Sequence, residues 1–327
     1  MLVLTSLVPD SFSLDTLNKV TKPVRSSTCS TYNHFYHSFS SFIFRRNGKS
    51  HFQLSEVIEF FNDLVNKGFR STTLKSIRSV LREPLKLYFP DFDLLKDPWV
   101  SNLIKYVRAN SLKCSFSFPK WDLDIVLRML KCRESQELDF VFKKTLFIVF
   151  IACPCRISEF RAISLSASSF SSLHALLKPH LLFQSKNQTD SFIPQPIVIQ
   201  NFPDDPSICP VTLLNAYINL TGSLCQDKNV NRPDQLWLNS NLKPLSLNLM
   251  RKWVKDIIFM ADPNAVSSVK VHSIRSQVAS HLLASGVSVK EIVAAMNWRS
   301  SSTFTKFYAR LGIQTSVKAV LAGHLAR

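Results

Sequence analysis

The first third of the chain shows the periodicity of amphipathic helices. From Phe52 to Asn66 the apolar residues recur three or four positions apart, so one helical face collects them. The segment from Thr72 to Leu87 repeats this spacing and places lysines and arginines on the opposite face. An aromatic-rich stretch from Ser27 to Phe44 and another stretch from Trp99 to Leu112 predict two more helices. Residues 1–112 are therefore expected to form a compact helical domain whose basic faces suit contacts with phosphates.

The pattern changes after a short linker from Cys114 to Pro119. Helical spacing returns from Leu123 to Leu130 and from Leu138 to Cys153. The end of the second stretch is apolar on all sides but too short to cross a bilayer, which predicts a buried helix. From Leu181 to Ile199, apolar runs flank a polar turn that carries Lys186, and this arrangement predicts a β-hairpin with the lysine at its tip.

Helix boundaries are most clearly marked near the C-terminus. One helix is predicted to begin at His272 and to end before Gly286, which suits the position after a helix C-cap. A capping box at Ser288 predicts the next helix, and a third carries Tyr308. We therefore expect a mainly α fold with a small β-sheet, in which residues 113–327 form the second domain.

The charge of the chain indicates its class of partner. The formal net charge is +17 at pH 7, and the isoelectric point is about 9.7. Residues 1–112 hold 15 basic and 9 acidic residues and the remainder holds 25 and 14, so both domains are basic. A protein this basic usually binds a polyanion, and nucleic acid is favoured over an anionic membrane surface.

The cysteines and the N-terminus indicate a compartment. The seven cysteines are odd in number, no two have the CxxC spacing of a zinc site, and several lie in apolar runs as buried thiols do. The first residues lack the basic region and the long apolar core of a signal peptide. These features predict a reducing, intracellular location without membrane attachment.

The sequence contains no Walker A loop, GxGxxG or HExxH motif. The candidate catalytic residues are instead dispersed along the chain. Cleaving a phosphodiester without a metal requires cations at the non-bridging oxygens, and two guanidinium groups can supply them. A tyrosine hydroxyl can hold the phosphoryl group covalently, and a lysine can protonate the leaving 5′-oxygen. His272 and Arg275 are three apart, so they share one face at a helix N-terminus, where backbone N–H groups also favour phosphate.

Two motifs carry a specific resemblance to a known family. His272-Ser-Ile-Arg275, followed by Trp298 and Tyr308, resembles the second catalytic box of the tyrosine recombinases. Arg156-Ile-Ser-Glu159 resembles the first box of the same family. The resemblance covers about residues 120–315, and the helical N-terminal domain is similar in position to the family's core-binding domain.

Further segments resemble one branch of that family. Pro119-Lys-Trp-Asp-Leu, Cys209-Pro-Val and the residues from Trp298 to Tyr308 look like the recombinases of eukaryotic mobile elements. Those elements are the Crypton transposons and the DIRS-like retrotransposons, between which the motifs do not choose. This branch implies excision and integration of a mobile element, and a nuclear location.

The resemblance implies a role for each main residue of the site. Arg156 and Arg275 would clamp the scissile phosphate, and Tyr308 would attack it to form a 3′-phosphotyrosyl bond. Lys186 would protonate the departing 5′-oxygen, with Lys178 as the competing candidate because hairpin registers are hard to assign from one sequence. Neither a metal ion nor ATP would be required.

Three supporting residues are also implied. His272 would assist in proton transfer, and Glu159 would support the active site without contacting the reacting atoms. Trp298 stands where many members have a second histidine, and its indole N–H can still donate a hydrogen bond to phosphate. Ten positions separate Trp298 from Tyr308, one more than in the commonest bacterial pattern.

The resemblance also implies an assembly. The core-binding and catalytic domains would form a C-shaped clamp around double-stranded DNA, and four protomers would assemble on two DNA sites. The apolar segment from Val317 to Leu325 would either dock onto a neighbouring protomer or pack in cis. Two other functions stay open at this stage: a type IB topoisomerase that relaxes DNA, and a recombinase-derived protein that binds DNA without cleaving it.

Overall fold

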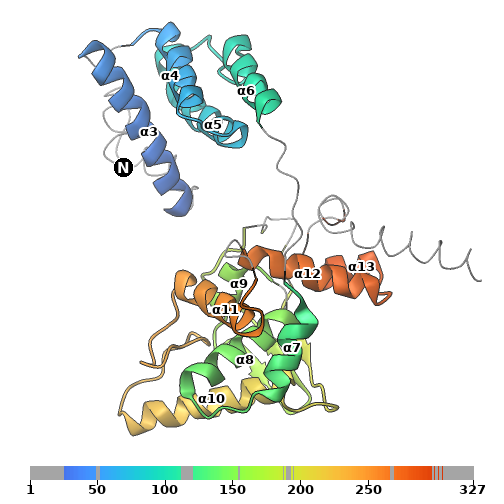
Figure 1. Ribbon diagram of the computed structural model, residues 1–327. Helices are drawn as coiled ribbons and strands as arrows, with labels where there is room; N and C mark the ends of the chain where they lie inside the picture. Colours follow the sequence, from blue (N-terminus) through green and yellow to red (C-terminus); the bar gives the residue numbers. More distant parts are fainter. Residues whose placement is uncertain are drawn as a thin grey trace, which may run out of the picture. The chain divides into compact units, whose positions relative to one another are not determined.

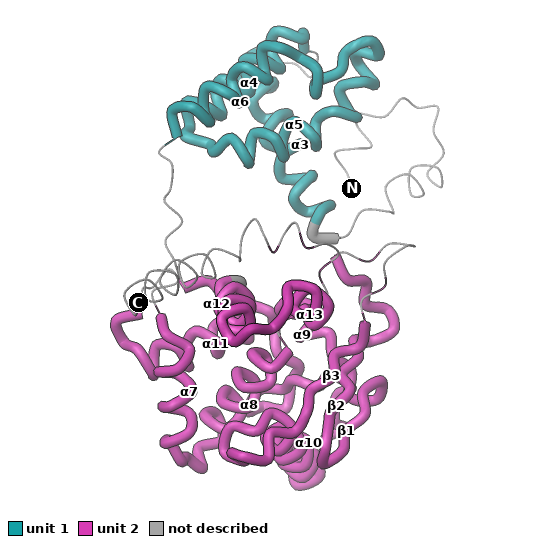
Figure 2. The backbone as a smooth tube through the Cα atoms, turned by 90° about the vertical axis from the view of Figure 1, so that its right-hand side faces the viewer, with its two compact units in different colours: residues 1–115 teal, residues 116–327 magenta. Residues whose placement is uncertain are grey.

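The structure is a computed structural model (Figure 1). It describes residues 26–48, 52–111, 121–153, 155–186, 188, 193, 195–265, 269–296, 298, 301 and 304, with the backbone alone at 26, 27, 47 and 272. The chain divides into two compact units, residues 1–115 and 116–327 (Figure 2). Each unit has its own hydrophobic core. The domain boundary expected from the sequence, between residues 112 and 113, lies outside the described residues.

The described part of unit 1 is helical. Its helices are α3 (Ser26–Asn47), α4 (Leu54–Asn66), α5 (Ser71–Tyr88) and α6 (Pro98–Asn110). The Asp97 side chain accepts a 2.7 Å hydrogen bond from the Val100 backbone N–H, and Pro98 occupies the first turn, so α6 has a strong start signal. All four helices predicted from the apolar spacing are confirmed.

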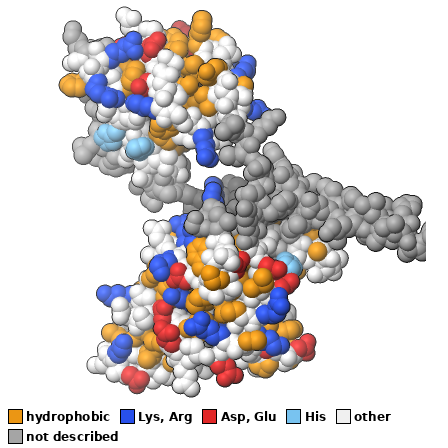
Figure 3. Space-filling view, in the orientation of Figure 1, with side chains coloured by type: hydrophobic (Ala, Val, Ile, Leu, Met, Phe, Trp, Pro, Cys, Tyr) orange, Lys and Arg blue, Asp and Glu red, His pale blue; other side chains and the backbone are white. Residues whose placement is uncertain are grey.

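The basic face expected on α5 is narrower than its sequence suggested. Arg78 donates a hydrogen bond to the Ser101 hydroxyl of α6, and Arg82 donates one to the Asp93 carboxylate. Both arginines are half-buried and bind other residues of unit 1. Figure 3 nevertheless shows Lys and Arg side chains on the visible surface of each unit.

The described helices of unit 2 share one hydrophobic core. They are α7 (Leu123–Cys132), α8 (Leu138–Ala152), α9 (Ile157–Arg161), α10 (Pro210–Asp227), α11 (Leu247–Ala261), α12 (Val271–Ala284) and α13 (Val289–Ala295). The apolar helix α8 is buried, as predicted, and α10 and α11 pack against it. No helix in the described ranges has the length and apolar character needed to cross a membrane.

A small antiparallel sheet completes unit 2. Its strands are β1 (Ser169–Phe170), β2 (His174–Leu177) and β3 (Ile197–Gln200), in the order β1-β2-β3. Leu177 pairs with Ile197 and Ala175 with Ile199, which turns Ala175, Leu177 and Ile199 into the core. The mainly α fold with a small β-sheet is confirmed.

The strand expected to begin at Leu181 was wrong. The partner of β3 is the earlier segment β2, while Leu181 and Leu182 lie in a turn and are 93% and 86% exposed. The reason is burial: β2 alternates core-facing and outward residues, whereas the apolar run at 181–183 has no core to face.

The helix ends near the site were predicted correctly. Gly286 follows α12 with φ of +86°, a left-handed conformation that favours glycine. The Ser288 hydroxyl accepts from the Glu291 backbone N–H, and the Glu291 carboxylate accepts from the Ser288 N–H, so a capping box opens α13. These signals place Met296, at the end of α13, beside Arg275 of α12.

Candidate active site

Arg156 and Glu159 form the most closely connected pair of the site. Arg156 precedes α9, and its backbone N–H donates a 2.9 Å hydrogen bond to Glu159 Oε2. Its guanidinium Nη1 donates a 2.8 Å bond to Oε1 of the same carboxylate. Among the described residues, Glu159 is the one hydrogen-bond partner of this guanidinium, so further N–H groups remain to meet a ligand.

Glu159 is held as a buried carboxylate. Burial raises its pKa, but hydrogen bonds from the Ser185 hydroxyl and from Arg156 outweigh that effect, and the net pKa is below the usual range. Ser185 Oγ lies 2.5 Å from Glu159 Oε1, the oxygen that also receives the Arg156 guanidinium. A charged, buried oxygen that accepts two donors has a fixed orientation.

Ser185 was not singled out from the sequence. It lies 26 positions from Glu159, in a connection that separates β2 from β3, and no short motif links the two. The sequence offered one indirect signal: Ser185 directly precedes Lys186, which was predicted to belong to the site. Lys186 lies in an exposed turn directly after Ser185, while Lys178 follows β2 and is exposed as well.

Arg275 is the second arginine of the site, and it is nearly covered. Its side chain is 2% exposed, and Nη2 donates a 2.9 Å hydrogen bond to the Met296 carbonyl oxygen. Its guanidinium carbon lies 5.3 Å from the centroid of the Trp298 ring. The side chain is thus oriented by an acceptor on one helix end and by an aromatic face.

Trp298 belongs to the core as well as to the site. Its ring is 7% exposed, and it lies 5.8 Å from the Phe304 ring, centroid to centroid. Its backbone N–H donates to the Val293 carbonyl oxygen of α13. The residue therefore packs against Arg275 within the core of unit 2, and its hydrogen bond to phosphate stays a prediction.

Two of the predicted residues are described only in part or not at all. His272 lies in the first turn of α12, which begins at Val271, but its side chain is outside the described set. Tyr308 and the apolar segment from Val317 to Leu325 also lie outside the described residues. Their roles therefore stay predictions.

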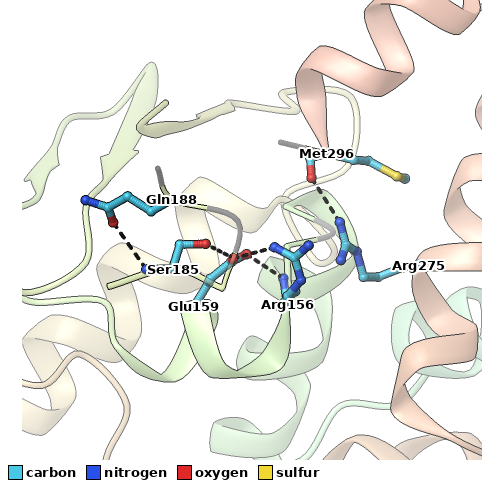
Figure 4. Close-up of polar contacts among 6 residues, drawn as sticks. All are labelled: Arg156, Glu159, Ser185, Gln188, Arg275 and Met296. Carbon is cyan, nitrogen blue, oxygen red and sulfur yellow. Dashed lines mark hydrogen bonds and ion pairs between the residues drawn. The ribbon is translucent and has the colours of Figure 1, made fainter. Parts of the chain in front are cut away.

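The arrangement brings the two arginines toward one region. Figures 1 and 2 both place α9 and α12 at the same end of unit 2. In Figure 4 the guanidinium groups of Arg156 and Arg275 face the same region between these helices, with Ser185 on the far side of Glu159. Two guanidinium groups so placed can hold the oxygens of one phosphodiester.

No metal site accompanies this arrangement within the ranges that the structure describes. There, no three His, Cys, Asp or Glu side chains gather as metal ligands would. The described cysteines are all free thiols, and Cys153, Cys155, Cys209 and Cys225 are buried.

The comparison with protein families identifies the class of protein to which this site and this mainly helical fold belong. The model of the phage integrase family matches residues 124–314, more than half of the chain, so the chain belongs to this family of tyrosine recombinases. The match covers every residue singled out above as a candidate for the site. No curated protein sequence gives a significant match.

Solved structures share the fold at low sequence identity. A lambda integrase dimer bound to a COC′ core site matches with a TM-score of 0.57 and 14% identity, over 93% of this chain and 77% of that chain. The Tn1549 transposon integrase in complex with circular intermediate DNA gives 0.60 and 12%, over 90% and 93%. A lambda integrase tetramer bound to a Holliday junction gives 0.55 and 14%, over 95% and 82%.

Proposed function

We propose that this chain is a site-specific DNA recombinase that cleaves and rejoins DNA through a 3′-phosphotyrosyl intermediate. One observation carries the proposal: Arg156, just before α9, and Arg275 of α12 face one region, and hydrogen bonds through Glu159 connect the Lys186 turn to it. Membership of the phage integrase family supports the same chemistry.

The reaction needs four kinds of group, each of which this chain supplies. Arg156 and Arg275 neutralise the non-bridging oxygens as negative charge develops on them. The Tyr308 oxygen attacks phosphorus and its proton passes to a base, for which His272 is the candidate. The bond from phosphorus to the 5′-oxygen breaks, and Lys186 protonates the departing oxygen. Because these groups cover the charge and both proton transfers, neither a metal nor ATP enters the proposed reaction.

The substrate and the assembly are proposed from charge and from the relatives. Duplex DNA suits a chain with a net charge of +17, and the similar integrases are described as bound to DNA, one as a dimer and one as a tetramer. We therefore place four protomers on two DNA sites, with both units binding the duplex. The C-terminal segment is either exchanged between protomers or packed in cis. The motifs shared with Crypton and DIRS-like recombinases suggest a mobile element and a nuclear location.

The test is a covalent-capture experiment. A DNA duplex carrying candidate element termini, nicked next to the expected cleavage position so that the cut product diffuses away, is incubated with the protein in EDTA. We expect a protein–DNA adduct that survives SDS, that is absent in Tyr308→Phe, and that persists in Tyr106→Phe, an exposed tyrosine of α6. Tight DNA binding without an adduct would favour a binding protein, and an adduct in Tyr308→Phe would show that another residue is the nucleophile.

A second readout separates the recombinase from a topoisomerase. Joining of two marked duplexes, with no relaxation of a supercoiled plasmid that lacks the termini, supports the recombinase. Relaxation of any supercoiled plasmid by a monomer would contradict it.

A further inference from the structure

The segment that carries Lys186 has one buried position. Among the described residues of 178–186 and 188, Ser185 alone is buried, at 4% exposure, while Lys186 and Gln188 are exposed. The described part of this connection buries little apolar surface, so packing contributes little to its position. Its placement depends on its polar contacts with the rest of unit 2.

The immediate surroundings of Lys186 form a closed turn. The Gln188 backbone N–H donates a 3.0 Å hydrogen bond to the Ser185 carbonyl oxygen, and the Ser185 N–H donates a 3.2 Å bond to Gln188 Oε1. These reciprocal bonds place Lys186 at the second position of a β-turn. The lysine backbone is therefore defined relative to Ser185.

The Ser185 hydroxyl then joins this turn to the arginine. It donates to Glu159 Oε1, which also accepts from the Arg156 guanidinium (Figure 4). One carboxylate oxygen thus receives a donor from the lysine turn and a donor from the phosphate-binding arginine. Hydrogen bonds to a carboxylate are stronger than those between neutral groups, so this link is stronger than the two hydrogen bonds that close the turn.

We propose that Ser185 is a positioning residue for strand cleavage, whose hydrogen bond to Glu159 holds Lys186 at the leaving 5′-oxygen. This inference rests on the proposed recombinase function. Ser185 does not contact the reacting atoms. It acts through the backbone of the turn, and Glu159 makes the position of Lys186 depend on the position of Arg156.

The step that Ser185 affects is the departure of the 5′-oxygen. The Tyr308 oxygen forms a bond to phosphorus, the bond to the 5′-oxygen breaks with its electron pair on that oxygen, and the Lys186 ammonium supplies the proton. If a sulfur atom replaces the bridging 5′-oxygen, the sulfur leaves as a thiolate and needs no proton. A defect confined to proton donation therefore disappears with the sulfur substrate, whereas a defect in phosphate binding remains.

The experiment compares cleavage rates of the full-length chain on the oxygen and sulfur substrates. The variants are Ser185→Ala, Ser185→Thr and Lys186→Ala. The matched control is Ser207→Ala, since the Ser207 hydroxyl donates a 2.6 Å bond to the Asp205 carboxylate before α10 and lies outside the site. Circular dichroism and DNA binding are measured for each variant.

On the oxygen substrate we expect Lys186→Ala to cleave at least about 100-fold more slowly and Ser185→Ala at least about 10-fold more slowly, as partial loss of a general acid predicts. Ser185→Thr keeps the hydroxyl and restores most of the rate, and Ser207→Ala cleaves like the wild type. On the sulfur substrate both slow variants recover to within about threefold of the wild type, because the proton is no longer required.

The possible failures are distinguishable. If Ser185→Ala stays slow on sulfur, its loss disturbs Arg156 or the fold rather than the lysine, and the inference is overturned. If Ser185→Ala cleaves oxygen DNA like the wild type, or if Lys178→Ala rather than Lys186→Ala is the variant rescued by sulfur, the inference is overturned while the recombinase function stands. If the wild type cleaves neither substrate, the proposed function itself fails.

Discussion

The Arg275 guanidinium stacks over the indole of Trp298, with 5.3 Å between the guanidinium carbon and the ring centroid. The Met296 carbonyl oxygen, two residues before the tryptophan, accepts a hydrogen bond from Nη2 of the same arginine. The end of α13 and the residues after it thus define the orientation of a side chain on α12. In the proposed function, an arginine oriented in this way binds phosphate without first losing conformational freedom.

Trp298 is expected to contribute to the stability of unit 2. Replacing it with alanine removes a buried ring, so the free energy of unfolding of unit 2 should fall by about 3–5 kcal/mol. Trp298→Phe keeps an aromatic face but loses the indole N–H, and should cost below about 2 kcal/mol. Urea denaturation measures both values, with Trp99→Ala as the exposed control within about 0.5 kcal/mol of wild type. A wild-type unfolding curve for Trp298→Ala would contradict the burial seen here.

Arg275→Lys is expected to abolish efficient cleavage. A lysine ammonium lacks the planar fork that bonds Met296 and stacks on Trp298 while still reaching phosphate. We expect covalent adduct formation to slow by about 100-fold or more, with DNA binding changed far less because many phosphates contribute to affinity. Arg251→Lys, on the exposed face of α11, is the control. Equal adduct rates in Arg275→Lys and wild type would refute this role.

Glu159 is expected to make stability depend on acid. Its pKa is below the usual range in the folded protein because Ser185 and Arg156 donate hydrogen bonds to it, despite the opposing effect of burial. A lowered folded-state pKa stabilises the fold above the ordinary value of 4.5, and this contribution is lost as pH falls below 4.5 through the folded-state value.

The measurement is urea denaturation from neutral pH into this acid range. Wild type should lose stability more steeply below pH 4.5 than Glu159→Gln, which has no titrating group there. Glu134→Gln, at an exposed position, should follow the wild-type curve. Parallel wild-type and Glu159→Gln curves would show that the carboxylate is not stabilised in the fold.

The two cores are expected to respond to mutation separately. Phe61 is fully buried in unit 1 and Phe147 in unit 2, and they belong to different clusters. Alanine at either position should destabilise its own unit by about 3–5 kcal/mol and leave the other unit unchanged. Hydrogen exchange of peptides from each unit measures this, and a matching loss of protection in both units would contradict it.

Several features of this protein could be predicted from the sequence because they depend on near neighbours. Helices follow from apolar spacing over a few turns. The end of α12 at Gly286 and the start of α13 at Ser288 depend on residues within three or four positions. The pairing of Arg156 with Glu159 is equally local, because the two are three positions apart at the start of α9. The spacing of the motifs that resemble the family can also be read from the sequence, because it depends only on positions along the chain.

The tertiary structure alone decided which distant residues meet. It paired β3 with β2 instead of the apolar run at 181–183, because only β2 presents alternate side chains to the core. It joined Ser185 to Glu159 across 26 positions and Arg275 to Met296 across 21. Such contacts carry no local signal, because they arise only when the packing of unit 2 brings separate elements together.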